Sequence, residues 1–287
     1  MTGFGERLRL AVADRGALCV GIDPHEGLLR EWGLDATAAG TREFGLRVVD
    51  AAAGRVAVVK PQVAFFERFG SAGFAALEDV LAAARAAGLI AIADAKRGDI
   101  GTTMDGYAAA WLSPGAPLEA DAVTVSPYLG VGALVPTFDL AERHGKGVFV
   151  LAATSNPEAL DLQRAVVARD EAHGGPQTVA HDVVREASAY SRARTAPGEW
   201  ASVGFVIGAT VDRSATGLPD ALTPPAPILA PGFGAQGAAL SDLAGIFGGS
   251  APHVLASASR SILRAGPEGL EAAIDAHNRE LKASTHA

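Results

Sequence analysis

The stretch Leu89-Ile90-Ala91-Ile92-Ala93-Asp94-Ala95-Lys96-Arg97-Gly98-Asp99-Ile100 joins an apolar run to a cluster of charged side chains. The run predicts a buried strand. Because side chains on a strand alternate between its two faces, Asp94 and Lys96 point the same way, and Asp99 follows in the turn that Gly98 opens. Charged side chains are rarely buried unless they are paired or used. The cluster is therefore either an ion pair that stabilises the fold or a place where charge acts on a substrate.

Short apolar runs of the same kind recur along the chain, rich in Val, Ile and Leu. Most are continuous rather than alternating, which is typical of parallel strands covered on both faces. Stretches with helical spacing lie between them, most clearly over 41–53 and 73–87, so the pattern indicates βαβ units. The eight runs are 18–22, 56–59, 89–93, 122–125, 148–152, 203–207, 228–230 and 254–256.

Eight such units predict the α/β class and, within it, a (β/α)8 TIM barrel, for which about 250 residues are typical. A doubly wound open sheet is the alternative. We expect one barrel domain over residues 1–287, with an insertion around 156–200 between the fifth and sixth strands. That connection is longer and richer in charge than the others, and it predicts helices and added structure on the rim of the barrel.

The composition narrows the classes of partner. The 287 residues are 49% hydrophobic and carry a formal net charge of −8 with no long basic run, so neither nucleic acid nor membrane is expected as a partner. No window approaches 18 uninterrupted apolar residues, and charges interrupt the N-terminal segment, so neither a membrane span nor a signal peptide is predicted. The single cysteine, Cys19, cannot form an internal disulfide, which fits a cytoplasmic location.

In a barrel the chemistry sits at the carboxyl ends of the strands, and polar groups follow nearly every predicted strand here. The loops after the seventh and eighth strands contain Gly232, Gly234, Gly237 and Arg260. Backbone can approach an anion closely at glycine, and a guanidinium can hold two phosphate oxygens, so these loops predict a phosphate site. The alternative is that the glycines only make turns and Arg260 pairs with a surface carboxylate.

Taken in order, several segments resemble the orotidine 5′-phosphate decarboxylases, in particular the longer bacterial branch of that family (type 2). The segments are Lys60-Pro61-Gln62, Asp94 to Thr103, Thr154-Ser155-Asn156-Pro157 and Pro231 to Gly237. The resemblance implies a barrel that works as a homodimer with shared active sites. It implies conversion of orotidine 5′-monophosphate to uridine 5′-monophosphate and CO2, the last step of de novo pyrimidine synthesis. It also implies that neither a metal nor an organic cofactor takes part.

The resemblance also implies roles for individual residues, by matching position. The catalytic group would be Lys60, Asp94, Lys96 and Asp99, with Asp99 and Thr103 contributed to the site of the neighbouring subunit. The substrate-binding residues would be Asp23 and Lys60 at the ribose, Ser155 at the pyrimidine, Gln236 and Arg260 at the phosphate, and Pro231 beside the substrate.

The chemistry of the cluster supports that resemblance. Loss of CO2 from C6 of the pyrimidine leaves an electron pair in the plane of the ring, where the π system absorbs it poorly. A Lys96 ammonium at C6 would stabilise the carbanion and then protonate it, and flanking carboxylates would keep Lys96 charged. Two alternatives remain. One is an Mg2+-dependent sugar-phosphate decarboxylase or aldolase of the same barrel superfamily, and the other is a non-catalytic nucleotide-binding barrel.

Overall fold

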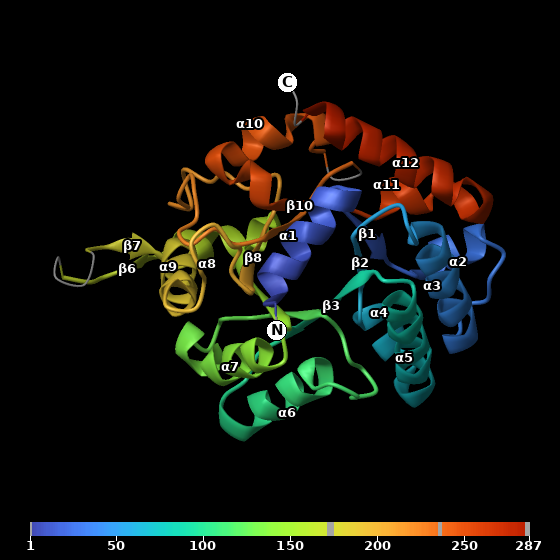
Figure 1. Cartoon of the computed structure of the whole chain (residues 1–287), viewed down its shortest axis with the longest axis horizontal. Coiled ribbons are helices and arrows are strands. Elements are labelled where there is room, and N and C mark those ends of the chain that lie inside the picture. Colours follow the sequence, from blue (N-terminus) through green and yellow to red (C-terminus); the bar gives the residue numbers. More distant parts are fainter. Residues whose placement is uncertain (1, 171–174, 235–236, 285–287) are drawn as a thin grey trace.

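The structure is a computed structural model, and it describes residues 2–170, 175–234 and 237–284. Eight parallel strands form a closed barrel surrounded by helices (Figure 1). The predicted (β/α)8 barrel is therefore confirmed, and the open doubly wound sheet is wrong. The barrel strands are β1 (Leu18–Ile22), β2 (Val58–Pro61), β3 (Ile90–Arg97), β4 (Ala122–Val125), β5 (Gly147–Ala153), β8 (Val203–Ile207), β9 (Ile228–Pro231) and β10 (Val254–Ala258).

Each strand pairs with the next barrel strand along the chain, and β10 pairs with β1 to close the ring. All eight predicted strands are present. Five of them, β2, β3, β5, β9 and β10, extend past the carboxyl ends of the apolar runs. Strand β2 includes Lys60, and β3 continues through Asp94 and Lys96 to Arg97. The backbone pairing continues where the side chains become charged, since the ladder hydrogen bonds do not depend on side-chain polarity.

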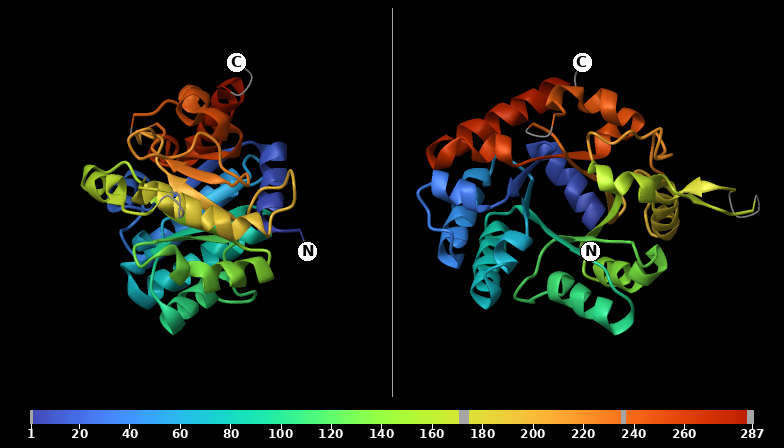
Figure 2. Two further views of the ribbon diagram at one scale, coloured as in Figure 1. Left: turned by 90° about the vertical axis from the view of Figure 1, so that its left-hand side faces the viewer. Right: turned by 180° about the vertical axis from the view of Figure 1, so that it is seen from behind.

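The helices lie around the outside of the barrel (Figures 1 and 2). The predicted helices over 41–53 and 73–87 correspond to α3 and α5. The first begins earlier than predicted because Thr37 caps it, its Oγ1 accepting a hydrogen bond from the Gly40 N–H. The described helices are α1 (Phe4–Arg15), α2 (Glu26–Glu31), α3 (Ala38–Ala52), α4 (Ala64–Glu67), α5 (Gly70–Ala86), α6 (Gly101–Leu112), α7 (Val135–Arg143), α8 (Leu160–Arg164), α9 (Val179–Arg192), α10 (Leu243–Phe247), α11 (Arg260–Leu263) and α12 (Gly266–Ser284).

The connection between β5 and β8 contains α8, α9 and a small antiparallel pair, β6 (Val166–Val167) and β7 (Gln177–Thr178). This pair extends outward from the ring of helices (Figure 2). Short 3-10 turns occupy Val131–Leu134, Pro157–Ala159, Leu240–Asp242 and Gly248–His253. Across the described ranges, no helix is both long enough and apolar enough to cross a membrane.

Residues on the barrel strands alternate between two apolar clusters. Leu18 and Val20 of β1 belong to the large cluster between strands and helices, whereas Cys19 belongs to a smaller one inside the barrel. Helix α1 covers one end of the barrel, and its Phe4 and Leu8 are fully buried in the inner cluster (Figure 1). That end of the barrel is therefore filled with apolar side chains, which leaves the other end for polar groups.

We predict that Phe4→Ala lowers the free energy of unfolding by about 3–5 kcal/mol, because it leaves a cavity in the inner cluster. Phe4 is fully buried and packs edge-on against Phe149, with ring centroids 6.2 Å apart. Urea unfolding followed by circular dichroism measures the change. Leu10→Ala on the same helix is the control, because Leu10 is 51% exposed and should change stability little. Equal decreases in the free energy of unfolding of the two variants would contradict the importance of Phe4 to the packing of the inner cluster.

Candidate active site

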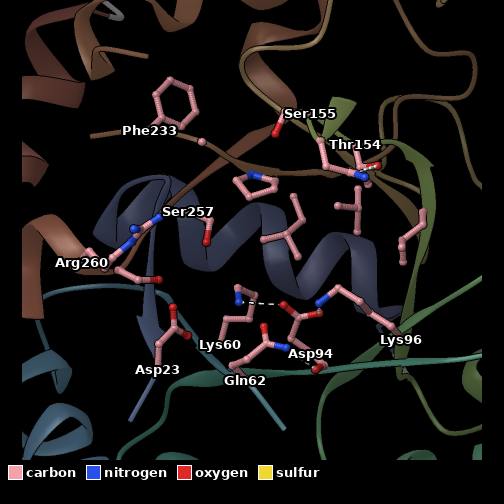
Figure 3. Close-up of a pocket in the computed structure, with 17 residues that line it drawn as sticks. Asp23, Lys60, Gln62, Asp94, Lys96, Thr154, Ser155, Phe233, Ser257 and Arg260 are labelled. Atoms are coloured by element: carbon pink, nitrogen blue, oxygen red, sulfur yellow. Dashed lines mark hydrogen bonds and ion pairs between the residues drawn. The ribbon is translucent and has the colours of Figure 1, made fainter. Parts of the chain in front are cut away.

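A cavity of about 300 Å3 opens at the carboxyl ends of the barrel strands (Figure 3). Its polar side chains continue the inward-facing rows of the strands: Lys60 follows Val58, Asp94 follows Ile92, and Ser257 follows Leu255. Of the residues predicted to act on substrate, those that line the cavity are Asp23, Lys60, Asp94, Lys96, Ser155, Pro231 and Arg260.

The carboxylate of Asp94 lies at the centre of the charged cluster. Its Oδ2 accepts a hydrogen bond from Lys60 Nζ at 2.9 Å, and its Oδ1 accepts one from Lys96 Nζ at 2.6 Å. Thr124 Oγ1 donates to Oδ1 as well, at 2.9 Å. One buried carboxylate thus holds two ammonium groups in fixed positions.

Burial and neighbouring charge act in opposite directions on this cluster. Burial by itself lowers the pKa of Lys60, but the carboxylates of Asp94 and Asp23 outweigh it and hold that pKa above its usual value. Burial by itself raises the pKa of Asp94, but Lys60 and Lys96 outweigh it and hold that pKa below its usual value. Both groups are therefore charged across the neutral range.

The backbone at Lys96 is strained in a way that aims its side chain. Among the described residues other than glycine, Lys96 alone has a positive φ, of 48°, and the pairing of β3 with β4 shifts register between Ala93 and Arg97. The Lys96 N–H donates to Thr124 Oγ1 at 2.9 Å and so secures this conformation. Such strain costs roughly 1–3 kcal/mol and persists where the surroundings hold it, commonly at functional sites. The Lys96 side chain is 45% exposed and lines the cavity.

Asp23 lies directly after β1 and lines the same cavity. Its Oδ1 is buried and accepts no hydrogen bond from any described residue. A buried carboxylate oxygen without a partner is costly, so this atom is suited to a donor that arrives with a ligand, such as a hydroxyl group.

Arg260 lies on the opposite side of the cavity from Lys96 (Figure 3). It begins the short helix α11, and no carboxylate among the described residues pairs with it, so the surface ion pair considered from the sequence is absent there. Gly232 and Gly234, on the loop after β9, have φ values of 114° and 73°. A side chain at Gly234 would contact Ser261 Oγ at 2.7 Å, so the loop approaches α11 closely only because glycine is present. Gln236 lies outside the described residues.

Two predicted residues lie away from this chain's own cavity. Asp99 follows β3 in a loop, where its Oδ1 accepts a hydrogen bond from the Ile100 N–H at 2.8 Å. Thr103 is exposed on α6. Large apolar side chains are exposed in the same region, since Ile100 is 60% and Tyr128 77% exposed.

The sequence analysis assigned no role to Thr124, Gln62 or Ser257. Thr124 is fully buried and contacts both Asp94 and Lys96. The available signal was a lone polar residue inside the apolar run 122–125. Gln62 and Ser257 both line the cavity. Gln62 directly follows β2 and is bridged to Asp94, whereas Ser257 lies on β10 opposite Cys19 and Pro231. In the part of the chain that the structure describes, no three His, Cys, Asp or Glu side chains are grouped to hold a metal ion.

We predict that Asp94→Asn lowers the free energy of unfolding at neutral pH by about 3–5 kcal/mol, because two ammonium groups lose their shared partner. The folded-state pKa of Asp94 is lowered from 3.8. The carboxylate's contribution is therefore complete above about pH 4 and is lost as the pH falls through the folded-state value. Urea unfolding from pH 3 to pH 7 should show that the difference in free energy of unfolding between the wild type and Asp94→Asn becomes smaller below about pH 4. The control is Asp79→Asn, which removes an exposed partner of Arg42 and should cost about 1 kcal/mol or less. A deficit that does not depend on pH would contradict this assignment.

Comparison with known proteins identifies the family. The family model described as orotidine 5′-phosphate decarboxylase / HUMPS matches residues 16–274. The orotidine 5′-phosphate decarboxylase of Salinispora arenicola is 52% identical over 277 residues, which cover 96% of this chain and 95% of the relative. The corresponding protein of Streptomyces coelicolor is 48% identical over 290 residues, and the match covers all of both chains.

A crystal structure from Streptomyces avermitilis, provisionally assigned to the same enzyme, superposes with a TM-score of 0.91. It is 48% identical, and the match covers 100% of this chain and 97% of that one. These findings confirm the resemblance read from the sequence motifs, including its bacterial branch. This chain belongs to the orotidine 5′-phosphate decarboxylase / HUMPS family.

Proposed function

We propose that the cavity at the carboxyl end of the barrel is where this chain, a carboxy-lyase, decarboxylates orotidine 5′-monophosphate to uridine 5′-monophosphate and CO2 in pyrimidine biosynthesis. The observation that carries the assignment of the site is the chain of contacts from Lys60 through Asp94 to Lys96. It holds a charged ammonium at one side of a cavity whose other side carries Arg260 (Figure 3).

The two sides of the cavity suit the two ends of the nucleotide. The Arg260 guanidinium and the backbone around Pro231 and Gly232 take the phosphate, since a guanidinium fork matches its oxygens. Asp23 and Lys60 lie between the two sides and take the ribose hydroxyls, which would supply the donor that Asp23 Oδ1 lacks. Ser155 then lies on the wall facing the pyrimidine.

Lys96 acts at C6 of the pyrimidine. When the bond from C6 to the carboxylate carbon breaks, its electron pair stays on C6 and CO2 departs. The Lys96 ammonium stabilises that pair and then transfers a proton to C6, which yields uridine 5′-monophosphate and a neutral amine that solvent reprotonates. Asp94 holds the ammonium in place beforehand, so little reorganisation accompanies the reaction.

The phosphate side works at a distance from the reacting carbon. Contacts of Arg260 with the phosphate remain the same in ground state and transition state, so by themselves they only improve binding. They contribute to rate by holding C6 against Lys96. Repulsion between Asp94 and the substrate carboxylate acts differently, because it is present in the ground state and is relieved when CO2 departs.

We propose that the protein works as a homodimer in which Asp99 and Thr103 enter the partner's site. Both lie outside their own chain's cavity, beside the exposed side chains of Ile100 and Tyr128. Exposed apolar side chains grouped on one face are typical of protein interfaces.

A cytoplasmic location accords with the one cysteine, Cys19, whose thiol pKa burial raises to about 12 and which is therefore unreactive.

We predict that Lys96→Ala lowers turnover at least about a thousandfold, because it removes both the stabilising cation and the proton donor. The measurement is the loss of orotidine 5′-monophosphate absorbance in excess EDTA, with uridine 5′-monophosphate identified as the product. Binding of uridine 5′-monophosphate, followed by calorimetry, should persist in the variant because Arg260, Asp23 and Lys60 remain.

Residual turnover within about tenfold of the wild type, or ~1.4 kcal/mol of barrier, would overturn the role of Lys96. The wild-type assay separates the remaining alternatives. Activity that EDTA abolishes and Mg2+ restores would favour the metal-dependent sugar-phosphate enzyme. A folded wild type that binds uridine 5′-monophosphate without turnover would favour the nucleotide-binding barrel.

We predict that Lys96→Ala and Asp99→Ala, each inactive, regain activity when mixed. Half of the dimers in an equal mixture contain one chain of each kind, and each of these has one complete site, so about a quarter of the wild-type activity should return. Activity is measured after subunit exchange, which native mass spectrometry of isotope-labelled chains verifies. Exchange without recovery would contradict the shared site.

A further inference from the structure

We propose that Gln163, in the connection between β5 and β8, is a positioning residue that fixes the loop Thr154–Asn156 for recognition of the pyrimidine. The inference rests on the proposed function. It assigns a positioning role to α8, which carries Gln163 and lies outside the barrel itself. Thr154, Ser155 and Asn156 line the cavity, whereas Gln163 stands behind them and is absent from the lining.

The two polar atoms of the Gln163 amide both bind Thr154. Its Oε1 accepts a hydrogen bond from the Thr154 N–H at 3.2 Å, and its Nε2 donates to Thr154 Oγ1 at 2.8 Å. Strand β5 ends at Ala153, whose carbonyl oxygen still accepts a hydrogen bond from the Gly208 N–H. Thr154 is thus the first residue beyond the barrel ladder, and Gln163 supplies the partner that the ladder no longer provides.

The contact also sets the direction of the hydrogen bonds that follow. Because Gln163 donates to Thr154 Oγ1, the hydroxyl hydrogen is free to point toward Asn156 Oδ1, 2.8 Å away. Asn156 then directs its Nδ2 toward Glu158 Oε2 at 3.0 Å, a contact that lowers the pKa of Glu158. The amide of Asn156 is therefore held in one of its two orientations by a chain that begins at Gln163.

Burial does not hold this loop. Ser155, Asn156 and Glu158 are exposed. Hydrogen bonds of about 1 kcal/mol each are then the main restraint on where the loop stands. Loss of the Gln163 amide should loosen the side of the cavity near the base and leave the phosphate side, set by Arg260, as it is.

The test compares a ligand with a base to one without. Uridine 5′-monophosphate and ribose 5-phosphate are titrated calorimetrically into the wild type, Gln163→Leu and Asp161→Asn, the last being the control on the same helix. Gln163→Leu should weaken uridine 5′-monophosphate binding about tenfold, as expected for lost hydrogen bonds. It should leave ribose 5-phosphate binding within about twofold, and Asp161→Asn should change neither.

A second variant, Gln163→Glu, keeps an acceptor for the Thr154 N–H but removes the donor to Thr154 Oγ1. Its affinity for uridine 5′-monophosphate should therefore lie between those of the wild type and Gln163→Leu. Equal weakening of both ligands, or no change for uridine 5′-monophosphate, would overturn the proposal. Turnover of orotidine 5′-monophosphate by the wild type tests the proposed function separately. A wild type without affinity for uridine 5′-monophosphate would overturn both.

Discussion

A carboxylate shared between two ammonium groups is the interaction on which the rest of the site depends. Asp94 is buried, and a buried charge without partners would be strongly destabilising. Lys60 compensates it from β2 and Lys96 from its own strand, while Thr124 completes the hydrogen bonding from β4. The contacts of Lys60 and Thr124 join β3 to its two neighbouring strands, so the position of the Asp94 carboxylate is as fixed as the barrel.

The barrel also places an apolar interior directly beneath the charged cluster. The inward-facing rows of its strands are apolar at the end that α1 covers and polar at the other end, and the same alternation places both sets. Gly21 shows how tightly the rows fit, since a side chain there would lie 1.8 Å from Ser259 Oγ, next to Arg260. The charged cluster consequently packs on the apolar side chains of the inner cluster, which keep water away from one side of it. Exclusion of water strengthens the electrostatic interactions of the charged side chains.

The two halves of the cavity are held by different means. The charged half is built on strands, and even the strained backbone of Lys96 is secured by a hydrogen bond to β4. The half that we propose faces the base is built on a loop, and its hydrogen bonds lead outward to α8. Sites on strands are held more rigidly than sites on loops, so in the proposed function the reacting Lys96 stands on the rigid half and recognition of the base on the adjustable one.

The sequence by itself determined the barrel, because eight continuous apolar runs separated by helical segments leave few other arrangements, and it placed Asp23, Lys60, Asp94, Lys96 and Arg260 at strand ends. It could not show that Thr124 joins the cluster, since that contact spans two strands. It placed Asp94 and Lys96 on one face of the third strand, but it could not show the register shift between Ala93 and Arg97, because hydrophobic patterning ends where the charges begin. Periodicity records which face of an element is buried, whereas distances across the barrel, and the strain that aims Lys96, exist only once the strands have closed.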